Sequence, residues 1–99
     1  MAAKLVFAPE TERDLAEAYA WYEHHRVGLG EEFLACVDAC IDGICRAPEM
    51  YALIRDTYRR ALVRRFPYAV FYEHSKGVVT VFAVLHTARD PDKWRERLP

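Results

Sequence analysis

The stretch YRRALVRRFPYAVFYEHSKGVVTVFAVLH, residues 58–86, decides the fold of this 99-residue chain. It contains three segments rich in β-branched and aromatic residues, separated by Pro67 and by SKG at 75–77. This composition between turn-forming residues predicts three consecutive antiparallel strands. The third segment is almost entirely apolar, as expected for a strand that is covered on at least part of both faces.

The residues before this stretch predict one short strand and two helices. KLVFA at 4–8 is a strand candidate, and Pro9 with the acids that follow marks the start of a helix over about 10–25. Two glycines in RVGLG, 26–30, predict a tight reversal into a second helix over about 30–46. Apolar residues recur at helical spacing in both helices: Leu15, Ala18, Tyr19 and Tyr22, then Phe33, Val37, Cys40, Ile41 and Ile44.

These elements predict a single α+β domain over residues 1–99. DPDKWRERL at 90–98 adds a short final helix, because Asp90 is a candidate cap and Pro91 suits a first turn. The order is then β-α-α-β-β-β with a short C-terminal α. We expect a small, mainly antiparallel sheet packed on one face by an antiparallel helical hairpin, with the other face free to stay open.

Composition limits the class of protein. Apolar residues make up 53% of the chain, enough for one modest core, but no apolar run approaches the roughly 20 residues of a membrane span. We therefore expect a cytoplasmic protein that does not bind membranes. Cys36, Cys40 and Cys45 are odd in number and lie on one predicted helix, which favours a reducing compartment and core packing. No second pair of ligands has the spacing of a metal site, so neither metal nor cofactor is expected.

Charge is distributed unevenly along the chain. Residues 1–50 contain 4 Lys or Arg and 10 Asp or Glu, a net charge of −6. Residues 51–99 contain 10 Lys or Arg and 5 Asp or Glu, a net charge of +5. This asymmetry predicts a basic surface that meets a phosphate backbone or an acidic partner. The alternative is that the two halves of the chain pair with each other.

Four arginines stand within seven residues of the first predicted strand of the stretch: Arg59, Arg60, Arg64 and Arg65. They face either water or an anionic partner. Arg60 and Arg64 are expected on the same strand face, about 13 Å apart, a spacing that suits successive phosphates.

Three further residues are candidates for the same surface. His86 is the only histidine beside a basic cluster, which comprises Arg89, Lys93 and Arg95. Its ordinary pKa of about 6.5 suits proton transfer, although a structural role at the strand end is the alternative. The indole of Trp94 can stack on a base or on a neighbouring side chain. Tyr72 is interpreted either as a core residue or as a residue of the open face.

The order of elements and four motifs together resemble the RelE/ParE family of toxins from bacterial type II toxin–antitoxin modules. The motifs are AYAWYE at 18–23, GLGEEFL at 28–34, YRRALVRRFPYAVFYE at 58–73 and VLHTARDPDKWRER at 84–97. FPYAVFY and LHTARDP resemble the ParE-like branch more closely. The resemblance covers nearly the whole chain and implies a cognate antitoxin as partner.

The resemblance also implies a target. ParE-like members poison DNA gyrase, whereas RelE-like members cut messenger RNA in the ribosome. A Tyr near the C-terminus and a paired-lysine stretch are typical of the nucleases, but this chain has Trp94 and no such stretch. We therefore expect a gyrase-directed toxin. The alternatives are a metal-independent, ribosome-dependent mRNA endonuclease, and a degenerate domain that only binds its antitoxin.

The candidate site follows from these two possibilities. If the protein cleaves RNA, the resemblance assigns catalysis to Arg60, Arg64 and His86. The candidate binding residues are Arg59, Arg65, Tyr72, Arg89, Trp94 and Arg95. For either target, replacing Arg60 and Arg64 together with alanine is expected to abolish toxicity without unfolding the protein.

Overall fold

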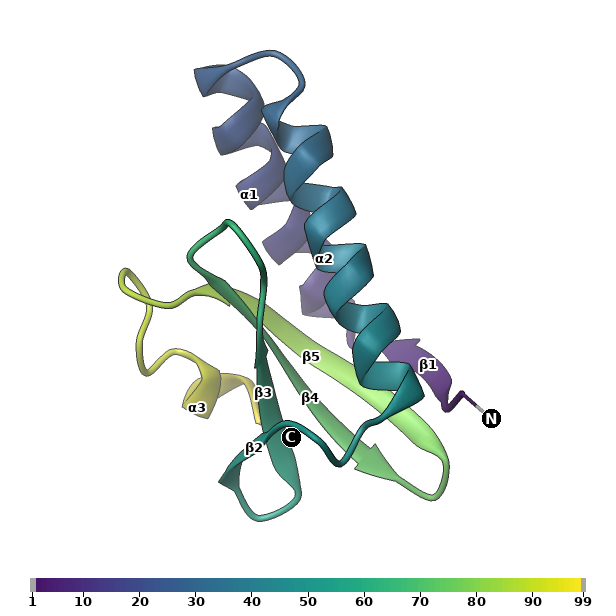
Figure 1. Cartoon of the computed structure of the whole chain (residues 1–99). Helices are drawn as coiled ribbons and strands as arrows, with labels where there is room; N and C mark the ends of the chain where they lie inside the picture. The colour runs from purple at the N-terminus through teal and green to yellow at the C-terminus, as the bar shows by residue number, and fades with distance from the viewer. Residues whose placement is uncertain (1, 99) are drawn as a thin grey trace.

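The computed structural model describes residues 2–98. Its elements follow the order β1 (Lys4–Phe7), α1 (Pro9–His25), α2 (Leu29–Arg46), β2 (Ala52–Arg55), β3 (Tyr58–Leu62), β4 (Tyr68–Ser75), β5 (Val78–His86) and α3 (Trp94–Arg97). One sheet has the strand order β1-β5-β4-β3-β2, and α1 and α2 form an antiparallel pair beside it (Figure 1). The predicted α+β fold with a helical hairpin is confirmed.

The sheet is antiparallel except at one edge. β1 pairs with β5 in parallel, with Lys4 opposite Val78 and Phe7 opposite Val81. β2 is a strand that the sequence did not predict. It is four residues long, largely exposed, and pairs with β3 through a tight turn in which Asp56 has φ 48°.

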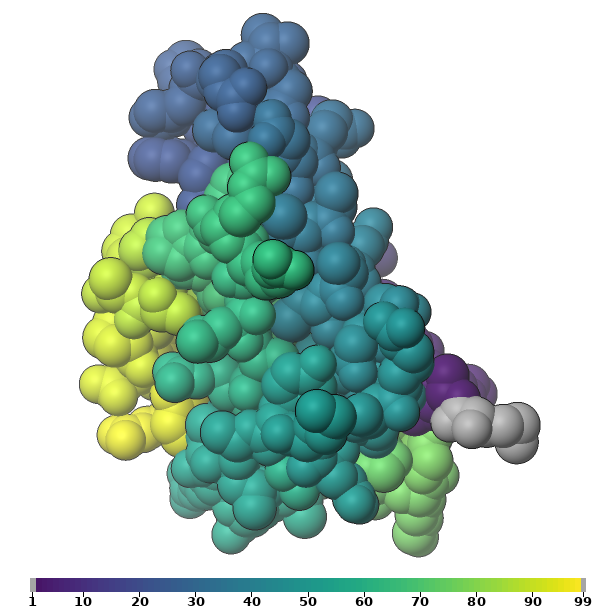
Figure 2. All heavy atoms as spheres, viewed as in Figure 1, coloured from purple at the N-terminus to yellow at the C-terminus, as the bar shows by residue number. Residues whose placement is uncertain are grey.

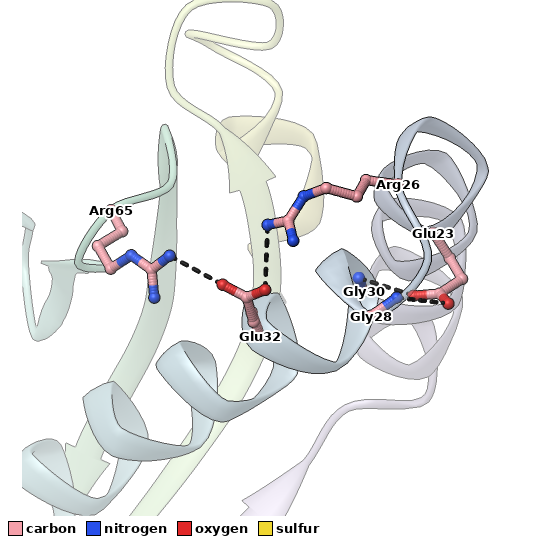
Figure 3. A network of polar contacts seen from close by, with 6 residues as sticks. All are labelled: Glu23, Arg26, Gly28, Gly30, Glu32 and Arg65. Carbon is pink, nitrogen blue, oxygen red and sulfur yellow. Dashed lines mark hydrogen bonds and ion pairs between the residues drawn. The ribbon is translucent and has the colours of Figure 1, made fainter.

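The turn between the helices is held by a carboxylate. Glu23, near the end of α1, accepts hydrogen bonds from the backbone N–H groups of Gly28 and Gly30, each at 2.9 Å (Figure 3). Gly28 has φ 91°, which favours glycine. Gly30 lies against α1, where a Cβ atom would come within 2.7 Å of the Tyr19 ring. The sequence GLG therefore fixes both the reversal and the close approach of the helices.

The main core lies between the helical hairpin and the sheet. The aromatic rings of Tyr22, Phe33, Phe66 and Tyr68 meet there, with centroids 4.9 to 6.0 Å apart. Of the apolar residues predicted to face the core from the second helix, Phe33, Val37, Ile41 and Ile44 are buried, and Cys40 is half-buried. Burial of these side chains is the main source of stability for the hairpin, since helices of this length depend on tertiary packing.

A second apolar cluster lies on the opposite face of the sheet. Its buried members are Ala69, Phe71, Phe82, Ala83 and Leu85. Trp94 and Leu98 pack against it from the C-terminal segment, with the Trp94 ring stacked on Phe71 at 6.3 Å and 14°. The space-filling view shows this segment, in yellow, lying directly against the green strands (Figure 2). The second face, which was expected to be free to stay open, is therefore open only in part, because the C-terminal segment covers the rest.

An ion pair attaches the C-terminal segment to the first helix. Arg97 donates to both carboxylate oxygens of Asp14, at 3.0 and 2.8 Å, and both side chains are largely buried. The same carboxylate accepts the backbone N–H of Val84 at 3.1 Å. Asp14 thus connects α1, β5 and α3. No helix within residues 2–98 has the length and apolar character needed to cross a membrane.

Candidate functional site

The two arginines of β3 point to opposite faces of the sheet. Arg60 is exposed and lies opposite Phe71, so it shares the face that the C-terminal segment partly covers. Arg59 lies opposite Tyr72 on the helix side, where it donates to the carbonyl oxygens of Glu49 at 3.2 Å and Tyr51 at 2.6 Å. Arg59 therefore holds the connection between α2 and β2, and Arg60 is the β3 arginine available on the second face.

Arg64 and Arg65 lie beyond the end of β3. The ladder with β4 ends at Leu62, and the chain turns back so that the N–H of Val63 bonds to the carbonyl of Tyr68 at 2.9 Å. The predicted placement of Arg60 and Arg64 on one strand face, about 13 Å apart, is wrong because the strand is shorter than the sequence pattern suggested. Arg65 adopts φ 70° in this turn.

Arg65 is directed toward α2 rather than along the sheet. It donates to Glu32 at 2.9 Å, and Arg26 donates to the other oxygen of the same carboxylate at 3.0 Å (Figure 3). The hydrogen bonds from Arg65 and Arg26 lower the pKa of Glu32. Glu32 was not selected from the sequence, since its partner Arg65 is 33 residues away and only the fold brings them together.

His86 occupies the end of β5 with one ring nitrogen engaged. Its Nδ1 accepts the backbone N–H groups of Ala88 at 3.1 Å and Arg89 at 2.9 Å. Two donors at Nδ1 leave Nε2 as the ring nitrogen that can contact another group. Nε2 can donate a hydrogen bond, while Nδ1 is already engaged by the backbone.

His86 also borders a polar cleft between α1 and the C-terminal segment. The cleft has a volume of about 340 Å³ and is lined by Asp14, Trp21, Tyr68, His86, Arg89 and Lys93 among others. Arg89 donates to the hydroxyl of Tyr68 at 3.1 Å, and the Tyr68 ring lies 5.2 Å from the His86 ring. Tyr68 is a further residue of this cleft that was not predicted from the sequence, because nothing distinguishes it there from the other aromatic residues of the predicted strands.

Two of the three candidate catalytic residues, Arg60 and His86, lie on opposite faces of the sheet. His86 is paired with Tyr68, which belongs to the core on the helix side, whereas Arg60 is paired with Phe71, which belongs to the second cluster. Tyr68 and Phe71 are three residues apart on β4, about 10 Å along the strand. The fold therefore does not bring Arg60 and His86 together.

Trp94 and Arg95 complete the surface beside Arg60. Trp94 is half-buried, and the guanidinium of Arg95 lies 5.2 Å from its ring centroid, within the range of a cation–π contact. Arg60, Trp94 and Arg95 thus provide two cations and part of an indole on the second face. We call these three residues the basic face.

Tyr72 is not part of any surface. It is fully buried, its hydroxyl donates to the carbonyl of Pro48, and burial raises its pKa to about 12. Of the two interpretations of Tyr72, the structure supports the core residue. Within residues 2–98 no group of three or more His, Cys, Asp or Glu side chains is placed to hold a metal ion.

Comparison with known proteins gives the family. The family model described as ParE toxin of type II toxin–antitoxin system, parDE, matches residues 5–91. The chain belongs to the ParE toxin family. A protein of this family is one component of a toxin–antitoxin pair.

A solved structure supports the fold of this ParE-family toxin independently. It is that of the chromosomal ParDE TA system from P. aeruginosa, similar with a TM-score of 0.75 over 86% of this chain and 96% of that chain. The sequence identity is 10%, so the likeness concerns the fold alone. No curated protein matches the sequence.

Proposed function

We propose that this ParE-family toxin arrests growth by binding DNA gyrase in the cytoplasm, without catalysing a reaction, and that a cognate antitoxin neutralises it. The observation that carries the proposal is the placement of Arg60 and His86 on opposite faces of the sheet. RNA cleavage needs a proton-transfer group and phosphate-binding cations around one phosphate. A binding surface has no such requirement.

We assign target binding to the basic face and to Arg64, which lies in the turn after β3. Arg60 and Arg64 are exposed, and no ion pair of either is found among residues 2–98. Trp94 and Arg95 add an aromatic and a cationic contact, which are common among the residues that dominate binding energy. Arg65 and Arg89 serve the surface indirectly, since each is bound to another side chain of the toxin.

The experiment compares three forms of the purified toxin in a gyrase supercoiling assay. The forms are the unaltered toxin, the double variant Arg60→Ala, Arg64→Ala, and the control Arg13→Ala, Arg46→Ala, which removes the same charge from the helical hairpin. We expect the unaltered toxin and the control to inhibit supercoiling, and the first variant to lose at least about tenfold in potency, as two surface cations near a target commonly contribute.

A parallel assay addresses the alternative target. Primer extension on messenger RNA in a translating extract would show new 3′ ends if the toxin cleaves RNA in the ribosome. Ribosome-dependent ends that vanish with His86→Ala, together with unaffected gyrase, would replace the proposal with an endonuclease. If cells continue to grow when the toxin alone is induced, the third alternative would be supported, namely a degenerate domain that only binds its antitoxin.

A further inference from the structure

The sheet ends at β1, and the outer edge of this strand has no pairing strand among residues 2–98. On the inner edge, the backbone N–H groups of Lys4 and Ala8 donate to carbonyl oxygens of β5 and of the turn before it, at 2.9 and 2.8 Å. Successive residues of a strand direct their backbone groups to alternate edges, so those of Leu5 and Phe7 point outward. None of these outward N–H and C=O groups has a hydrogen-bond partner in the described part of the chain.

The side chains along this edge are apolar and exposed. Leu5, Val6 and Phe7 are 39%, 40% and 42% exposed. Leu5 and Phe7 lie opposite Val79 and Val81, which belong to the core on the helix side, and Val6 therefore faces the second side of the sheet. The strand forms the margin of the molecule, in purple, in Figures 1 and 2. Three neighbouring apolar side chains thus flank the free backbone groups.

The two edges of the sheet differ in how they are protected. Edge strands are commonly blocked against further pairing by a charge, a proline or a bulge. At the other edge, β2 has a register shift between Leu53 and Arg55, and Arg55 adds a charge. β1 keeps a continuous register with β5, and its one charged residue is Lys4 at its start. β1 is therefore the edge that can accept another strand.

We propose that β1 pairs with β1 of a second copy of the toxin, in antiparallel orientation, about a two-fold axis at Val6. In this register the outward N–H and C=O groups of Leu5 bond to those of Phe7 of the second copy, and the symmetry repeats the exchange. The side chains of Leu5 and Phe7 then meet across the seam, and Val6 meets Val6 of the second copy on the other face. Every free N–H group of the edge gains an acceptor, and every exposed apolar side chain gains an apolar neighbour.

The charges at the ends of the strand favour the same arrangement. Lys4 lies opposite Ala8 of the second copy, so the two Lys4 side chains are not opposed. Helix α1 begins directly after Ala8 and carries Glu10 and Glu12 in its first turn. Each ammonium group therefore approaches acidic residues of the other copy, a complementarity that the strand finds in itself.

The dimer leaves the basic face accessible, and the inference does not depend on the target of the toxin. Arg60 lies on β3, which is separated from β1 by β5 and β4. At about 4.8 Å between neighbouring strands, this places Arg60 roughly 14 Å from the seam. A single pair of short strands buries little surface, so we expect a weak dimer whose population depends on concentration.

The first test is sedimentation velocity of the full-length toxin between about 5 and 500 μM, where a weak dimer would form. We expect the dimer fraction to rise over this range. Val6→Glu opposes two carboxylates at the axis and should raise the dissociation constant at least about tenfold. Leu5→Pro should also weaken the dimer, because it removes an outward N–H and no bond to β5. The control Leu53→Glu, an equally exposed change on β2, should leave the dimer unaffected.

The second test addresses the register. Residues opposite each other at the axis have Cα atoms about 4.5 Å apart, within the range of a disulfide. Val6→Cys should therefore form an intermolecular disulfide under mild oxidation, whereas Leu5→Cys, which lies opposite Phe7, should form far less. The unaltered toxin gives the background of its own cysteines, and intact mass after oxidation measures all three.

Several outcomes would overturn the proposal. They are a monomer at every concentration, a dimer that Val6→Glu and Leu53→Glu weaken equally, or a disulfide that forms as readily through Leu5→Cys as through Val6→Cys. Circular dichroism of each variant confirms that the comparisons refer to folded protein.

Discussion

Asp14 connects α1 both to β5 and to the C-terminal segment. Its two oxygens accept hydrogen bonds from the Arg97 guanidinium and from the backbone N–H of Val84. A buried ion pair is not in itself strong evidence of stabilisation, but removing one member leaves the other charge buried without compensation. Without Asp14, Arg97 would keep only its hydrogen bond to the carbonyl of Phe82 at 3.3 Å, and its Nε atom is already buried without a partner.

We therefore expect Asp14→Ala to lower the free energy of unfolding by about 3 kcal/mol. The matched control is Asp42→Ala, which breaks the exposed pair with Arg46 and should cost less than about 0.5 kcal/mol. Urea unfolding followed by circular dichroism measures both. Equal costs for the two variants would mean that the Asp14 contacts contribute no more than a surface pair.

Glu32 gives stability a dependence on pH. Its pKa is lowered in the folded state, so its contribution is present above the ordinary value of 4.5 and is lost as pH falls toward the lowered pKa. The difference in unfolding free energy between the unaltered protein and Glu32→Gln should thus be present at pH 7 and shrink below pH 4.5. Asp38→Asn is the control, because it removes an exposed carboxylate of the same helix that makes no ion pair within residues 2–98. A Glu32→Gln difference that stays constant with pH would contradict the assignment.

At the scale of elements, the turn between α1 and α2 depends on one close contact. A Cβ atom on Gly30 would meet the Tyr19 ring at 2.7 Å and a Glu23 oxygen at 2.9 Å. Gly30→Ala is expected to destabilise the protein by about 1 to 3 kcal/mol through this overlap. In a Tyr19→Ala background the added cost should be smaller, since only the Glu23 contact remains. A double-mutant cycle in urea measures the coupling, and strictly additive costs would remove the Tyr19 contact as the cause.

Patterns within one element could be predicted from the sequence, and contacts between distant elements could not. Phe33, Val37, Ile41 and Ile44 repeat at helical spacing, and that repetition alone identifies the buried side of α2. Nothing near Trp94 indicates that it stacks on Phe71, because the contact spans 23 positions and follows from the path of the C-terminal segment. The prediction of the length of β3 was wrong for a similar reason. The strand ends where the turn at residues 63–66 begins, and its own composition does not mark that end.

For the whole molecule, the separation of charge predicts how the toxin meets its target. The basic half includes the basic face, while the helical hairpin carries most of the acids. If gyrase is bound through that face, the association rate should fall as salt rises from low to about 0.5 M. Arg60→Gln, Arg64→Gln should flatten this dependence, whereas Arg13→Gln, Arg46→Gln, with the same change in net charge, should leave it steep. Surface plasmon resonance gives the rates, and identical slopes for both variants would exclude a localised basic contact.

The parallel pairing of β1 with β5 affects how the protein folds during translation. β1 can pair only after β5 has been synthesised, because Lys4 lies opposite Val78. The same holds for two contacts of α1: Thr11 donates to the carbonyl of Val81, and Asp14 accepts from the N–H of Val84. At about 5 to 20 residues per second, translation separates the first strand from its partner by roughly 4 to 15 seconds. Each nascent toxin therefore passes through an interval in which its helical hairpin exists without the sheet that supports it.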